Sequence, residues 1–155
     1  MVKKNSTLFL IILSAGLIAA DQITKWLARN LTESIAIIKD ILHLTFVMNF
    51  GVAFGFLQGA NDIVLWLYLV VLGLIIYFYN RFPKDNFSQV MLFLIIAGII
   101  GNFIDRILFG YVTDFIDFRV WPVFNLADIY LNVGLIGIII RELLDGRKEE
   151  VKIKK

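Results

Sequence analysis

Four long apolar segments constrain the fold of this chain more than any other feature of its sequence. They lie at residues 7–27, 63–79, 88–109 and 124–140. Each is close to the length of about 20 residues that a helix needs to cross a hydrocarbon core about 30 Å thick. With 59% hydrophobic and 18% charged residues, the chain lies outside the usual range of soluble domains. The sequence therefore predicts a mainly α membrane protein with four transmembrane helices, built as a single domain over residues 1–155.

The positions of the basic residues predict how these helices are oriented. Lys and Arg near the ends of membrane helices are retained on the cytoplasmic side. Most of them lie at the N-terminus, between the second and third segments, and in a tail at 141–155. Both termini are therefore expected in the cytoplasm, with outer loops at 29–62 and 110–123. The tail is expected to lie on anionic membrane lipid, and no nucleic-acid partner is indicated.

An alternative interpretation of the N-terminus is a secretory signal peptide. Lys3 and Lys4 precede an apolar stretch, and a cut after Ala20 would suit such a peptide. Its removal would leave three membrane helices and contradict the orientation that the charges predict. The helical pattern continues from Asp21 to Leu27, which favours a retained first helix.

Extended segments are predicted in both outer loops. Residues 43–49 alternate apolar with more polar side chains at period 2 and are rich in strand formers, which predicts a short β element. Residues 110–123 mix strand-like and aromatic residues and predict a second extended piece. In the third and fourth apolar segments, small side chains predict close packing of helices. They are Gly98, Gly101, Gly134 and Gly137.

Carboxylates in and beside the apolar segments are the candidate functional groups. A charged side chain at membrane depth costs about 2.5 to 3.5 kcal/mol on insertion scales, so it is expected to have a function. Residues three, four or seven positions apart share a helix face. Three polar stripes follow from such spacings: Asn102 with Asp105 and Arg106, Asn125 with Asp128 and Asn132, and Asp21 with Lys25.

The predicted topology brings the three stripes together at the outer leaflet. The first and third helices run outward and carry their stripes late, whereas the fourth begins outside with its stripe. Asn49 and Asp114 lie in outer loops on the same side. The inner halves of the helices are almost purely apolar. A single functional site toward the outer leaflet is therefore expected.

The residue types restrict the chemistry of this site. The single histidine, His43, has no obvious Ser partner, so a Ser-His-Asp triad is not favoured. The chain has no Cys and no H-E-x-x-H helix, so neither a thiol nucleophile nor a metal site is expected. Two carboxylates held close in a poorly solvated site cannot both ionise, so one stays protonated and the other acts as a base. Such a pair can activate water against an amide without metal or cofactor.

Asp114 and Asp128 are the candidate pair, because neither has an adjacent base. Asp117 is an alternative to Asp114. Two further acids have a countercharge in their own helix, which predicts a structural or substrate-orienting role. They are Asp21 with Lys25, and Asp105 with Arg106.

A transporter and a non-catalytic scaffold are the two alternatives to hydrolysis. A small ion or proton transporter would also use intramembrane acids. It predicts polar residues along the full depth of the membrane or broken helices in repeated halves, and the cytoplasmic halves here have neither. A non-catalytic membrane scaffold would leave the acids replaceable by amides.

The sequence resembles the bacterial lipoprotein signal peptidases, also called type II signal peptidases, over nearly its whole length. The blocks are jointly specific, although each one alone would be weak. One departure is brevity, because only residues 119–123 separate the third block from the fourth. In chain order the blocks are Asp21-Gln22-x-Thr24-Lys25, Asn49-x-Gly51-x-Ala53-Phe54, Gly101-Asn102-x-Ile104-Asp105-Arg106 continuing through Gly110-x-Val112-x-Asp114-Phe115-x-Asp117-Phe118, and Phe124-Asn125-x-Ala127-Asp128.

The resemblance implies an aspartic endopeptidase of the bacterial cytoplasmic membrane, with a small extracytoplasmic β cradle formed by the outer loops. It would remove the signal peptide from diacylglyceryl-modified prolipoproteins by cutting just before the lipidated Cys, without a cofactor. Membrane lipid would be a further partner, and cyclic peptide antibiotics such as globomycin would inhibit it. Asp114 and Asp128 would be the catalytic aspartates. The residues implied to support the site or position substrate are Asp21, Lys25, Asn49, Gly51, Asn102, Asp105, Arg106 and Asn125.

Overall fold

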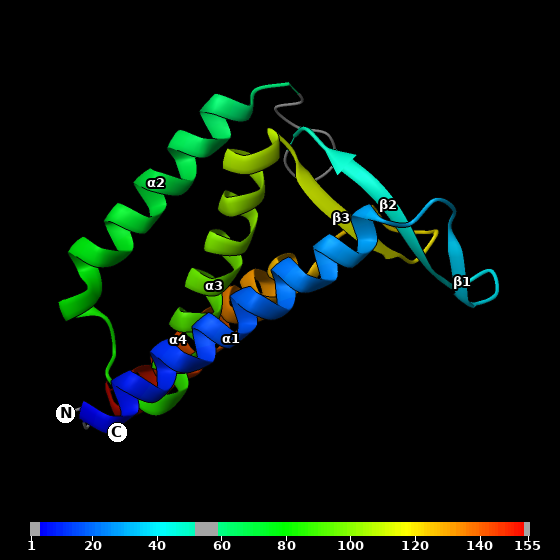
Figure 1. The fold of residues 1–155 in the computed structure, drawn as a ribbon. Coiled ribbons are helices and arrows are strands. Elements are labelled where there is room, and N and C mark those ends of the chain that lie inside the picture. The colour runs from blue at the N-terminus through cyan, green and yellow to red at the C-terminus, as the bar shows by residue number, and fades with distance from the viewer. Residues whose placement is uncertain (1–3, 52–58, 154–155) are drawn as a thin grey trace.

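The computed structural model describes residues 4–51 and 59–153. A small sheet lies at one end of the helices, and the start of the first helix and the end of the last helix lie at the other (Figure 1). The elements run in the order α1 (Lys4–Arg29), β1 (Ile35–Ile38), β2 (Leu42–Asn49), α2 (Asn61–Phe78), η2 (Tyr79–Arg81), α3 (Asn86–Phe109), β3 (Val112–Asp117) and α4 (Leu126–Ile153).

Three helices of the described chain are long and apolar enough to cross a membrane. They cover Thr7–Arg29, Asn61–Arg81 and Asn86–Phe109. Each bound lies within two residues of the first, second or third predicted segment. The prediction of a mainly helical membrane protein is thereby confirmed.

The fourth predicted segment, 124–140, is helical, but its bounds differ from the prediction. α4 begins at Leu126 and continues to Ile153, through most of the expected tail. The extension contains no Pro and is rich in Glu, Lys and Leu, which favour helices. The apolar run between Asp128 and Arg141 rises only about 18 Å, less than the thickness of a hydrocarbon core. For this reason α4 is not among the helices that are long and apolar enough to span.

The sheet is antiparallel, with strand order β1-β2-β3. β2 confirms the strand predicted over residues 43–49, and β3 confirms the extended piece predicted in the second outer loop. β1 was not predicted, because its four residues are all apolar and show no alternation. Between β2 and β3, Val47 pairs with Asp114 and His43 pairs with Asp117. The two acids are three residues apart in one strand, so their side chains lie on opposite faces.

Glycines allow the helices to approach closely around the polar ends of α1, α3 and α4. A Cβ atom at Gly98 would lie 2.5 Å from the carbonyl oxygen of Ala127. One at Gly101 would lie 2.7 Å from Oδ2 of Asp21. The predicted packing role of these small residues is confirmed. Their effect is to bring three helices within hydrogen-bond reach of one another.

Candidate active site

The first turn of α4 holds Asp128 in place. Asn125 lies just before this helix, and its Oδ1 accepts the backbone N–H of Asp128 at 3.0 Å. In return, Asp128 Oδ2 accepts the backbone N–H of Asn125 at 3.1 Å. This reciprocal pattern is that of a capping box. The other oxygen, Asp128 Oδ1, accepts a hydrogen bond from Asn102 Nδ2 of α3 at 2.8 Å.

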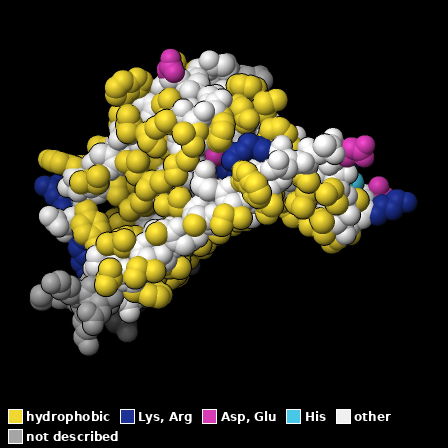
Figure 2. Space-filling model, in the orientation of Figure 1, with side chains coloured by type: hydrophobic (Ala, Val, Ile, Leu, Met, Phe, Trp, Pro, Cys, Tyr) yellow, Lys and Arg dark blue, Asp and Glu magenta, His cyan; other side chains and the backbone are white. Residues whose placement is uncertain are grey.

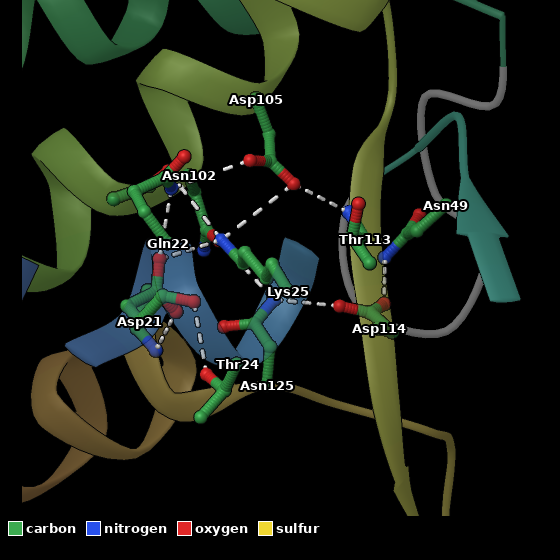
Figure 3. A network of polar contacts seen from close by, with 12 residues as sticks. Asp21, Gln22, Thr24, Lys25, Asn49, Asn102, Asp105, Thr113, Asp114 and Asn125 are labelled. Carbon is green, nitrogen blue, oxygen red and sulfur yellow. Dashed lines mark hydrogen bonds and ion pairs between the residues drawn. The ribbon is translucent and has the colours of Figure 1, made fainter. Parts of the chain in front are cut away.

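β3 brings Asp114 to the same asparagine. Asn125 Nδ2 donates to Asp114 Oδ1 at 2.6 Å, and Asn49 Nδ2 of the paired strand β2 donates to Asp114 Oδ2 at 2.8 Å (Figure 3). Asn125 is therefore hydrogen-bonded to both candidate acids. Asp114 of β3 and Asp128 of α4 are thus brought together by a shared partner.

Asp114 has an unusual protonation equilibrium. Its side chain is buried, and this burial, followed by the negative charge of Asp128, raises the pKa of Asp114 to about 7. The hydrogen bonds from Asn49 and Asn125, and the charge of Lys25, act in the opposite direction on this pKa. Near neutral pH the Asp114 carboxyl can therefore hold or release a proton, as general acid–base chemistry requires.

Lys25 determines which way Asn102 faces. The fully buried Nζ of Lys25 donates to Asn102 Oδ1 at 2.9 Å, and Asn125 Nδ2 donates to the same oxygen at 3.2 Å. Because this oxygen accepts both bonds, the amide NH₂ of Asn102 must point toward Asp128. Lys25 thus orients a hydrogen bond to Asp128 through an intermediate residue.

Buried acids balance the charge of Lys25. Its Nζ lies 2.9 Å from Asp21 Oδ2 and 3.8 Å from Asp105 Oδ2, and all three side chains are inaccessible to solvent (Figure 3). The second oxygen of Asp21, Oδ1, accepts the backbone N–H of Ala127 at 2.9 Å. This N–H belongs to the first turn of α4, where the helix dipole favours a negative charge. Asp21 therefore links α1 to the start of the helix that carries Asp128.

The expected pairing of Asp105 with Arg106 is wrong. Neighbouring residues of a helix point about 100° apart, so the two side chains diverge. Arg106 donates instead to the carbonyl oxygen of Gly51 and, at 3.2 Å, to Asn61 Oδ1. It thereby ties α3 to the start of α2.

The actual partners of Asp105 include residues that the sequence analysis missed. Asp105 Oδ2 accepts the backbone N–H of Thr113 at 2.8 Å and lies 3.6 Å from Arg29 Nη1. Gln22 Nε2 lies 3.3 Å from Asp105 Oδ1. Arg29 follows Lys25 by four residues, and this helical spacing could have revealed it. Thr113 acts through its backbone, for which the sequence carries no signal.

Asp117, the alternative to Asp114, has partners of its own. Its carboxylate accepts a hydrogen bond from Thr45 at 3.2 Å and lies 3.4 Å from Arg119 Nη1. These partners are on the other face of β3 from Asp114. The structure therefore groups Asp114, and not Asp117, with Asp128.

A serine does lie near the histidine, which the sequence analysis did not anticipate. Ser34 Oγ is 3.4 Å from Nδ1 of His43. The guanidinium of Arg119 donates to the same nitrogen at 2.9 Å. Because Arg119 occupies the position that the acid takes in a Ser-His-Asp triad, these residues do not form one.

Ala53 and Phe54 of the second sequence block lie outside the described residues. Over the residues that are described, no cluster of three His, Asp or Glu side chains could hold a metal ion.

Comparison with known proteins identifies a family of similar sequence. The model of the family described as signal peptidase (SPase) II matches residues 13–144. The lipoprotein signal peptidase of Halothermothrix orenii is 43% identical over 126 residues, which cover 79% of this chain and 87% of that protein. The lipoprotein signal peptidase of Fusobacterium nucleatum subsp. nucleatum is 37% identical over 158 residues, which cover 97% of this chain and 96% of that protein.

Two solved structures are also similar, both described as bacterial membrane enzymes determined by the in meso method. The one at 2.3 Å resolution matches with a TM-score of 0.81 and 35% sequence identity, covering 89% of each chain. The one at 1.9 Å resolution matches with a TM-score of 0.75 and 35% identity, covering 87% of this chain and 92% of the other.

Proposed function

Because the chain belongs to the signal peptidase II family and so removes signal peptides from prolipoproteins, we propose that it does so as an aspartic endopeptidase with Asp114 and Asp128 as its catalytic pair. The observation that carries this proposal is their shared partner. Asn125 is hydrogen-bonded to Asp114 through its side chain and to Asp128 through its backbone.

In the proposed reaction a water molecule attacks the carbonyl carbon of the scissile amide. Asp128, in the first turn of α4, takes a proton from this water, and the protonated Asp114 gives its proton to the carbonyl oxygen. The tetrahedral intermediate then collapses. A proton from one of its hydroxyl groups returns to Asp114. Asp128 protonates the amide nitrogen as the C–N bond breaks. Each acid ends the cycle in its starting state.

The buried network around the pair is proposed to position it. Asn102 holds Asp128 and is itself oriented by Lys25, while Asp21 joins α1 to the first turn of α4. A small displacement of either acid would separate it from the water. These residues are therefore positioning residues, which act through contacts with the pair or with each other.

The proposed substrate is a prolipoprotein whose Cys carries diacylglycerol, cleaved just before that Cys. Large apolar side chains are exposed beside the site at the ends of α1 and α3, including Trp26, Leu27, Ile107 and Leu108. Such a surface suits the acyl chains of the substrate, while the polar pair meets its peptide bond. Cyclic peptide inhibitors such as globomycin are expected at the same place.

The proposed topology has four spans, both termini in the cytoplasm, and the site and sheet toward the outer side. The distribution of basic residues supports this orientation. In Figure 1 the start of α1 and the end of α4 lie at the end of the bundle remote from the sheet, as an even number of spans requires. The short apolar run of α4 is compatible with a span if Asp128 faces the site and Arg141 extends toward the headgroups.

The proposal is tested with Asp114→Asn and Asp128→Asn in a detergent assay on a diacylglyceryl-modified precursor. Each is expected to lower cleavage by about 10²- to 10⁴-fold, because an amide cannot transfer the proton. Asp117→Asn is the matched control, since it makes the same change on β3 and should cleave normally. An unlipidated precursor should stay uncut. Full activity of either pair variant in a folded protein would refute the assignment.

A further inference from the structure

An apolar cavity of about 340 Å³ lies between α2, α3 and α4. Figure 2 shows hydrophobic side chains gathered over α2 and the helices beside it. On α3 the lining residue nearest to the site is Ile95, which precedes Asn102 by seven residues, about 10 Å along the helix axis, so the cavity is separate from the proposed catalytic pair. Its walls are apolar and include Val71, Ile75, Phe78, Phe82, Leu92 and Leu135.

Two cations lie in the link that follows α2, and this link also contributes Phe82 to the wall of the cavity. The guanidinium of Arg81 lies 5.8 Å from the ring centroid of Phe78, which is itself a lining residue. Nζ of Lys84 lies 3.4 Å from the ring centroid of Tyr79. In Figure 2, Lys and Arg side chains lie at the left edge of the molecule, where α2 ends.

These two cations have no carboxylate partner within the described chain. The nearest acids along the sequence and on α4 are held by another base. Asp85 Oδ2 lies 3.1 Å from Arg141 Nη2, which also contacts Asp145 at 3.4 Å. Lys84 Nζ donates to the carbonyl oxygen of Tyr79, which is neutral and does not balance its charge. Arg81 and Lys84 therefore leave positive charge near the apolar cavity.

We propose that the cavity holds an acyl chain of an anionic membrane phospholipid and that Arg81 and Lys84 bind its phosphate. An apolar cavity between membrane helices is exposed to lipid chains, and basic pockets between such helices bind anionic headgroups. The planar guanidinium of Arg81 can bind a phosphate through two hydrogen bonds. The site belongs to the leaflet on the η2 side, opposite the catalytic pair.

The signal peptide of a substrate is a poorer occupant because of its charge. A signal peptide carries a basic region before its apolar segment. That region would lie beside Arg81 and Lys84 and be repelled by them, whereas a phosphate would be attracted.

The test measures the lipids retained by the purified full-length chain. The protein is equilibrated with vesicles of equal phosphatidylglycerol and phosphatidylethanolamine, and bound lipid is counted by native mass spectrometry. We expect phosphatidylglycerol to be preferred, and Arg81→Gln to lower this preference about fivefold. Lys39→Gln, which removes an exposed cation in the link between β1 and β2, should leave the preference unchanged.

A second pair of variants tests the cavity itself. Val71→Phe places a ring in the cavity and should lower the retention of both lipids, whereas Val70→Phe makes the same change at the next residue, which does not line it. Equal retention of the two lipids by the wild type, or equal retention by Val71→Phe and Val70→Phe, would overturn the proposal. Displacement of the lipid by a synthetic signal peptide, one for one, would also overturn it.

Discussion

At the scale of single residues, three asparagines hydrogen-bond to the proposed catalytic acids. Asn125 is bonded to both acids, Asn49 to Asp114 and Asn102 to Asp128. An amide donates a hydrogen bond to a carboxylate without adding a charge. The asparagines can therefore orient the pair while one proton remains available to it.

Cleavage by the wild type is expected to fall as the pH rises through about 7, because burial raises the pKa of Asp114 to this value and the proton it donates is lost above it. The hydrogen bond from Asn49 lowers this pKa. Asn49→Ala should therefore move the alkaline limb of the kcat/KM profile to higher pH. Asn30→Ala, which removes an exposed amide, is the control. A limb that stays in place or moves to lower pH in Asn49→Ala would contradict this role.

Lys25→Met is expected to destabilise the protein by about 3 to 5 kcal/mol, because it leaves Asp21 and Asp105 buried without the ammonium group between them. Unfolding in detergent measures the effect. Lys39→Met removes an exposed cation and should change stability by less than about 0.5 kcal/mol. Adding Asp21→Asn to Lys25→Met should recover part of the lost free energy of unfolding. Equal stability of the two Lys variants would show that the buried ion pair does not hold the site together.

At the scale of elements, α3 connects the two halves of the site. Its face carries Asn102, which binds Asp128, and Asp105, which binds the backbone at the start of β3. The helix ends at Gly110, whose φ of 75° reverses the chain so that β3 follows at once. The position of Asp114 therefore depends on how α3 ends.

Packing between α3 and α4 should tolerate no added methyl group at Gly98. In Gly98→Ala the new Cβ would meet the carbonyl oxygen of Ala127, so we expect a loss of about 1 to 3 kcal/mol despite the better helix propensity of Ala. Gly16→Ala is the matched control on α1, where nothing lies within 4 Å of the Cβ position. It should be neutral or stabilising. Unfolding temperatures that are equal for the two variants would contradict this account of the contact.

At the scale of the whole molecule, the buried charge of the described residues is confined to the sheet end of the helices. This distribution supports hydrolysis at one membrane interface, because a transport path requires polar groups through the full depth. The apolar cavity occupies the opposite half. Within the described chain the buried charged residues are Asp21, Lys25, Asp105, Arg106, Asp114 and Asp117.

The proposed topology can be tested by single cysteines, since the chain has none of its own. A membrane-impermeant maleimide added outside intact cells should label Glu33→Cys, in the loop after α1. It should not label Asn80→Cys, in η2, until the membrane is permeabilised. A permeant maleimide, as the control, should label both. The reverse pattern would place the catalytic pair on the cytoplasmic side.

The sequence by itself determined the features that depend on local pattern. The length of the apolar segments predicted the spans of α1, α2 and α3 to within two residues, because a span is set by consecutive side chains. Alternation at period 2 predicted β2, and the spacing of four residues predicted the contact of Asp21 with Lys25. Each of these signals is complete within one element.

Only the tertiary structure decided which residues from different elements meet. The choice between Asp114 and Asp117 depends on the register of β3 and on the hydrogen bond from Asn125. Neither of these is encoded by a local pattern. Asp105 took the backbone of Thr113 as its partner, since the sharp end of α3 brings β3 back beside it. The cavity at the η2 end is likewise a property of three helices together. Contacts between elements depend on the close approach that small residues permit, so they become known only when the chain is folded.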